Sequence, residues 1–219
     1  MRLLPASIRA RILGVFALSL AALTGALGYG LVQLRAVGDG VATINAAWLP
    51  LTATLNAARI LDAARRVLGV DFDELSRLAL SAPSGAEGLV MVPWFEGERT
   101  PNLPDATASL VGMTLKNFTP ENVARAAVEG LLCLMGEGLE AIRRLGVSIE
   151  RVSLIGGGAK SEAVRRLAPE VLGVPVDVPA PAEYVALGAA RQAAWALTGS
   201  RPAWESSSTE TYEAVSRPE

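Results

Sequence analysis

The sequence contains no histidine and only one cysteine, Cys133, among its 219 residues. Without histidine, the chain has no Ser-His-Asp or Cys-His catalytic group and no histidine-ligated metal site. With one cysteine, it has no internal disulfide and no cysteine-cluster zinc site. Any chemistry must therefore use carboxylates, lysine, hydroxyl groups, backbone amides or a bound ion.

The chain also carries little net charge. Its 20 basic and 22 acidic residues give a formal charge of −2 at pH 7. A nucleic-acid-binding protein normally carries a basic excess or a basic stripe, so this balance argues against nucleic acid as a partner. The hydrophobic fraction of 51% is instead typical of a chain that folds around a substantial core.

One long segment near the amino terminus lacks charge altogether. Residues 12–34 contain no charged side chain and are flanked by Arg11 and Arg35. As a helix this run would be about 35 Å long, enough to cross a hydrocarbon core of about 30 Å. It predicts a single transmembrane helix, and the basic residues before it place the amino terminus in the cytoplasm. A cleaved signal peptide and a buried core helix are the alternative interpretations.

Residues 1–50 as a whole form the first predicted region. The span and the break at Trp48-Leu49-Pro50 resemble the amino-terminal start of a bacterial transmembrane sensor or chemoreceptor. This resemblance implies anchoring in a bacterial inner membrane.

From Asn56 onwards, helical and strand patterns alternate. Asn56, Asp71 and Thr119 are expected to cap helices, and Gly69 and Gly146 to end them. Helices are predicted over 56–68, 119–145, 161–172 and 183–198, with a short one from Asp71, and strands over 89–95, 151–155 and 174–178. This order predicts an α/β fold with a parallel sheet.

Two further expectations concern the ends of this body. The continuously apolar run 89–95 is expected to be a strand buried on both faces. Residues 200–219 are rich in serine, glutamate and proline, and are expected to form a disordered tail.

The most informative motif is a glycine turn between the strand 151–155 and the helix 161–172. Gly156, Gly157 and Gly158 follow the strand directly, and Lys160 and Ser161 lead into the helix. Glycines at such a turn remove the Cβ atoms that would keep a phosphate or a nucleobase away from the backbone. The N–H groups at the helix start favour an anion. Tight strand–helix packing without any ligand is the alternative explanation of the same glycines.

Three further segments, in order along the chain, carry a family resemblance. Residues 108–129 resemble a signature pattern of the FGGY carbohydrate kinases. The loop 96–101 before it, and the glycine turn and residues 183–190 after it, occur in the family's order. In detail these segments are most similar to xylulose kinases. The resemblance covers residues 54–199 and implies an RNase H-like carboxy-terminal lobe of the actin/hexokinase/Hsp70 type.

The resemblance also implies ligands and site residues. It implies ATP and Mg²⁺ as cofactors, a sugar as the second substrate, and a cytoplasmic location for the kinase domain. The nucleotide would lie against Gly156, Gly157, Gly158, Lys160, Ser161, Ala186 and Gly188. Neither a catalytic residue nor a metal ligand of the chain is assigned.

The family's sugar pocket, amino-terminal phosphate loop and aspartate base have no counterpart in this sequence. The expected function is therefore that of a partial sugar kinase, the nucleotide-binding lobe for phosphorylation of D-xylulose, with little activity by itself. A fused or truncated chain joined near residues 50–54 would reconcile the membrane segment with an ATP-binding lobe. The alternative function is a membrane-anchored, non-enzymatic sensor or interaction module that uses the α/β lobe as a scaffold.

Overall fold

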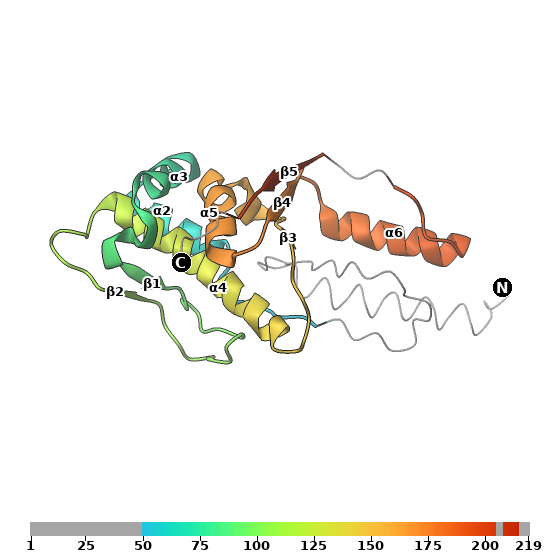
Figure 1. The fold of residues 1–219 in the computed structure, drawn as a ribbon, viewed down its shortest axis with the longest axis horizontal. Helices are drawn as coiled ribbons and strands as arrows, with labels where there is room; N and C mark the ends of the chain where they lie inside the picture. Colours follow the sequence, from blue (N-terminus) through green and yellow to red (C-terminus); the bar gives the residue numbers. More distant parts are fainter. Residues whose placement is uncertain (1–49, 205–207, 215–219) are drawn as a thin grey trace, which may run out of the picture.

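The computed structural model describes residues 50–204 and 208–214 (Figure 1). Within these two ranges, no helix combines the length and the apolar character that crossing a bilayer requires. The transmembrane helix predicted over residues 12–34 lies outside the described residues, as does nearly all of the first predicted region.

Helix α4 (Pro120–Arg143) is the centre of the described fold. Its predicted start is confirmed, because the Thr119 side chain accepts a hydrogen bond from the Asn122 N–H at 3.3 Å. Pro120 follows in the first turn, where no backbone donor is needed. Helices α2 (Arg59–Leu68), α3 (Phe72–Ser81) and α5 (Glu162–Leu172) pack against α4, and together they bury the main hydrophobic core.

The helix boundaries follow local signals with two exceptions. Gly69 ends α2 with a φ of 69°, and the Asp71 side chain caps α3 by accepting from the Glu74 N–H at 2.8 Å. Asn56 does not cap α2, because its side chain binds a distant loop instead. The long helix ends at Arg143, before the predicted residue 145.

The second half of the chain forms a three-stranded sheet in the order β3-β4-β5. Strands β3 (Val152–Ser153) and β4 (Val176–Pro179) are parallel, with Val152 opposite Val176, and α5 is the crossover between them. This confirms the predicted parallel α/β unit. Strand β5 (Thr209–Tyr212) pairs antiparallel with β4. The prediction of a disordered tail is therefore wrong for these four residues, which gain the hydrogen bonds of an otherwise open sheet edge.

The apolar run 89–95 forms a different structure from the one predicted. Within this run, only Val90–Val92 form a strand, β1, which pairs antiparallel with β2 (Ser109–Val111) in a separate two-stranded sheet. The short 3-10 helix η1 (Ser84–Gly88) precedes β1. The expectation of burial on both faces is wrong, because Met91 and Leu110 pack on the core whereas Val90 is 54% exposed.

Helix α6 (Tyr184–Thr198) follows β4 and ends at Gly199, which has a φ of 74°. The boundaries agree with the predicted helix 183–198. Figure 1 shows α6 projecting beyond the sheet, on the side away from α2 and α3. None of its residues is buried.

Candidate functional site

A cavity of about 1000 Å³ lies at the carboxyl ends of the parallel strands β3 and β4. Open parallel sheets bind their ligands at this edge, because the loops that leave neighbouring strands converge there. The loop after β3 forms one wall and the loop after β4 another, and residues at the start of β5 complete the lining. The lining residues are Ile155, Gly156, Gly157, Ala159, Lys160, Arg165, Val178, Pro179, Ala180, Pro181, Ala182, Glu183, Tyr184, Ser208, Thr209 and Glu210.

The glycine turn supplies a wall with little side-chain bulk. Gly156 has a φ of 89°, a conformation that favours glycine, and Gly157 begins the short 3-10 helix η2 (Gly157–Lys160). A Cβ atom added to Gly157 would meet no other atom within 4 Å. A ligand can therefore approach the backbone of Gly157 closely.

The end of the turn is fastened to the helical body. The Ser161 side chain accepts from the Val164 N–H at 3.3 Å, which caps α5, and its Oγ lies 3.0 Å from the Ser76 Oγ of α3. A Cβ atom on Gly158 would lie 3.9 Å from the Ala58 side chain, just before α2. Ser161 and Gly158 thus support the turn and do not line the cavity.

The opposite wall comes from the segment between β4 and α6. The Tyr184 hydroxyl donates a hydrogen bond to the Ala180 carbonyl, which holds the first residue of α6 against the loop. Val178, Pro179 and Pro181 add apolar surface there. Ala186 and Gly188, predicted to wall the nucleotide, lie further along α6, are exposed, and do not line this cavity.

The cavity contains charges of both signs. Lys160 and Arg165 supply two cations, and Glu183 and Glu210 supply two carboxylates. Arg165 was not among the residues predicted from the sequence. Its place on the first turns of α5, directly after the glycine turn, is the signal that could have singled it out.

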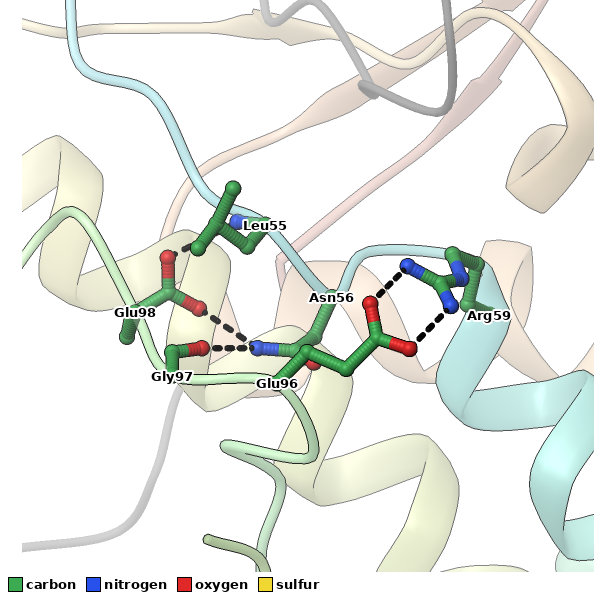
Figure 2. Close-up of polar contacts among 6 residues, drawn as sticks. All are labelled: Leu55, Asn56, Arg59, Glu96, Gly97 and Glu98. Atoms are coloured by element: carbon green, nitrogen blue, oxygen red, sulfur yellow. Dashed lines mark hydrogen bonds and ion pairs between the residues drawn. The ribbon is translucent and has the colours of Figure 1, made fainter. Parts of the chain in front are cut away.

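The predicted loop 96–101 is part of a separate, buried network (Figure 2). Glu98 is 1% exposed, and its carboxylate accepts hydrogen bonds from the Leu55 N–H at 2.8 Å and the Asn56 side chain at 3.1 Å. Glu96 and Arg59 form a two-bond ion pair at the exposed side of the same loop. Glu98 therefore holds the 96–98 loop to the segment before α2 and has no free oxygen directed at a substrate.

Metal ligation by this part of the chain is limited. Residues 50–204 and 208–214 contain no group of three or more acidic, cysteine or histidine side chains placed to hold a metal ion.

The described region has an α/β fold with a cavity at the carboxyl ends of its parallel strands, the edge at which open parallel sheets bind ligands. Comparison with known proteins names the family. Residues 21–197 match the carboxy-terminal domain of the FGGY family of carbohydrate kinases. The matched range starts upstream of the predicted boundary at residue 54. The chain belongs to the FGGY family.

The relatives and solved structures agree with this assignment. The chain is 40% identical over 152 residues to xylulose kinase of Haemophilus influenzae and 35% identical over 186 residues to xylulose kinase of Streptomyces rubiginosus. These alignments cover 69% and 82% of this chain, but only 31% and 37% of the relatives. The chain thus spans about a third of the length of the curated relatives it matches.

A solved structure gives the same result. The crystal structure of xylulose kinase from Bifidobacterium adolescentis matches with a TM-score of 0.67 and 60% sequence identity. The match covers 75% of this chain and 33% of that chain. The predicted resemblance to FGGY kinases and the predicted α/β fold of their carboxy-terminal lobe are confirmed.

Proposed function

We propose that the described region is the nucleotide-binding lobe of a carbohydrate kinase, with Mg-ATP as the phosphoryl donor and D-xylulose as the acceptor. The observation that carries this proposal is the cavity between the glycine turn and the β4–α6 segment. Its volume is at the upper end of the range of ligand pockets, about 300–1000 Å³.

The lining fits a nucleotide in three respects. Gly157 leaves room for close approach to the backbone. Lys160, at the end of the glycine turn, can bind phosphate oxygens. The apolar side chains Val178, Pro179 and Pro181, with Tyr184, offer a surface for a base. When bound, ATP would supply the phosphoryl group, and these residues would hold and orient it.

The sugar is inferred from the relatives. Both curated relatives described above are xylulose kinases, which favours D-xylulose as the acceptor. We also propose that the described lobe needs further polypeptide for turnover. Phosphoryl transfer depends on positioning donor and acceptor together, and the described cavity accounts for the donor. Use of ATP would place the lobe in the cytoplasm.

Calorimetric titration of the full chain with Mg-ATP tests the proposal. We expect saturable binding, and we expect Gly157→Val to weaken it about tenfold or more, because the new side chain would occupy cavity space. Gly157 lacks a positive φ and has no close neighbour, so the substitution should leave the fold intact.

Gly188→Val is the matched control. Gly188 also has open space at its Cβ position and no positive φ, but it lies on α6 away from the cavity. The Gly188→Val variant should bind Mg-ATP with the affinity of the unmodified chain. A folded chain that shows no saturable binding would contradict the proposed function.

A further inference from the structure

Two neighbouring arginines of α5 differ in their surroundings. Arg166 forms an ion pair with Glu162, one turn earlier on the same helix, at 3.3 Å. Arg165 has no carboxylate within ion-pair distance among the described residues, and it lines the cavity. Arg166 does not line that cavity.

The hydrogen bonds of Arg165 leave much of its guanidinium available. Its Nε is buried and has no hydrogen-bond partner among the residues the structure describes. One Nη donates to the Ala159 carbonyl in the glycine turn, but at 3.4 Å, which is long for such a bond. A guanidinium carries five N–H donors, and a buried donor without a partner is costly. The Nε is enclosed by protein, so any donor offered to a ligand is an Nη. With the bond to Ala159 and a second bond to Tyr212, the described residues accept fewer bonds than the five N–H groups can donate.

Tyr212 of β5 is a neighbour of Arg165. Burial and then a hydrogen bond to Glu210 raise the pKa of Tyr212, while the charge of Arg165 and its hydrogen bond to the tyrosine act in the opposite direction. Arg165 therefore lies between β5 and the glycine turn, and lines both the cavity and a smaller neighbouring hollow that contains Glu210, Tyr212 and Glu213.

We propose that Arg165 binds the phosphate groups of the nucleotide, opposite the backbone of the glycine turn. The guanidinium fork matches the geometry of phosphate oxygens. The apolar wall of Val178, Pro179 and Tyr184 then receives the base and the ribose. This inference rests on the proposed function and adds a residue and an orientation of the ligand within the same cavity.

The test compares two ligands that differ only in their phosphates. Affinities of the full chain for ADP and for adenosine are measured by calorimetry for the unmodified protein, Arg165→Gln and Arg166→Gln. We expect Arg165→Gln to weaken ADP binding about tenfold or more, because a charge-assisted hydrogen bond is lost, and to change adenosine binding less than about twofold. Arg166→Gln should leave both affinities unchanged.

Arg165→Lys is included because it keeps the charge and most of the aliphatic stem. It should retain part of the ADP affinity, and it provides a folded variant should Arg165→Gln lose secondary structure by circular dichroism. Unchanged ADP binding in both Arg165 variants would overturn the inference while leaving the proposed function standing. Equal losses of ADP and adenosine would also overturn it. An unmodified chain that binds neither ligand would overturn the proposed function and this inference together.

Discussion

Helices α4 and α6 are both rich in alanine and leucine, yet their surroundings are opposite. Thirteen residues of α4 are buried, among three other helices and the β1 strand. No residue of α6 is buried, and Leu197 is 88% exposed. The difference shows that residues of high helix propensity suit both segments to a helix, but that only packing makes a helix part of the core.

The cavity lies between the helical body around α4 and the start of α6. Its glycine-turn wall is tied to the helical body through the pairing of Ser161 with Ser76. Its other wall leads directly into α6 at Tyr184. The position of the turn is therefore set by the core, whereas the second wall is held by the bond between Tyr184 and Ala180 and by β5, where the Ala180 N–H donates to the Ser208 carbonyl at 2.9 Å.

Hydrogen exchange should give the largest contrast between the two helices. Amides in the middle of α4 should exchange only when the whole region unfolds, while those of α6 should exchange through local opening. With a typical stability of at least 5 kcal/mol, protection in α4 should exceed that in α6 by about a thousandfold or more. Mass spectrometry of peptides from each helix measures this, and equal protection would mean that α6 is packed as firmly as α4.

Truncation of one leucine in each helix should give a smaller but still clear contrast. Leu132 on α4 is fully buried, so Leu132→Ala should lower the free energy of unfolding by about 2–5 kcal/mol. Leu197→Ala on α6 should change it by less than about 0.5 kcal/mol. Urea denaturation of both variants provides the comparison. A large loss for Leu197→Ala would show that α6 contributes to the core.

Glu98 and Glu96 of the 96–98 loop allow the same comparison between a buried and an exposed side chain. Glu98→Gln replaces an acceptor with an NH₂ group opposite N–H donors, and should cost about 1–3 kcal/mol in unfolding free energy. Glu96→Gln removes an exposed ion pair and should leave the urea midpoint at neutral pH almost unchanged.

The small contribution of Glu96 should depend on pH in a defined direction. Its hydrogen bonds to Arg59, and then the charge of Arg59, lower the pKa of Glu96 below the usual value. The pair therefore stabilises the fold above the ordinary glutamate pKa, and the contribution is lost as the pH falls through the lowered value. The urea midpoints of the unmodified protein and Glu96→Gln should converge in acid. A difference that grows in acid would contradict this assignment.

Much of the local structure could be predicted from short patterns. The caps at Asp71 and Thr119, the helix end at Gly69 and the glycine turn all depend on residues within about four positions of one another. The order of strands and helices was enough to indicate the parallel unit around α5, and the motifs carried the resemblance to the FGGY family.

Patterns this short could not predict the partners of Asn56 and Glu98. A cap was a reasonable expectation for Asn56, but its amide binds Gly97 and Glu98, about forty residues later, once the 96–98 loop reaches it. Likewise, the exposure of Val90 was decided by pairing with β2 in a sheet that has only one face on α4.

By itself, the amino-acid sequence determined the helices and the glycine turn, because hydrogen-bond caps and hydrophobic periodicity act between near neighbours. Its motifs also carry the resemblance to the FGGY family. The tertiary structure decided that Arg165 lines the cavity while Arg166 pairs with Glu162. It also brought Ser161 to Ser76, 85 positions away, and made residues 209–212 the strand β5. Such contacts join segments far apart in the chain. They exist only after the core around α4 has brought those segments together.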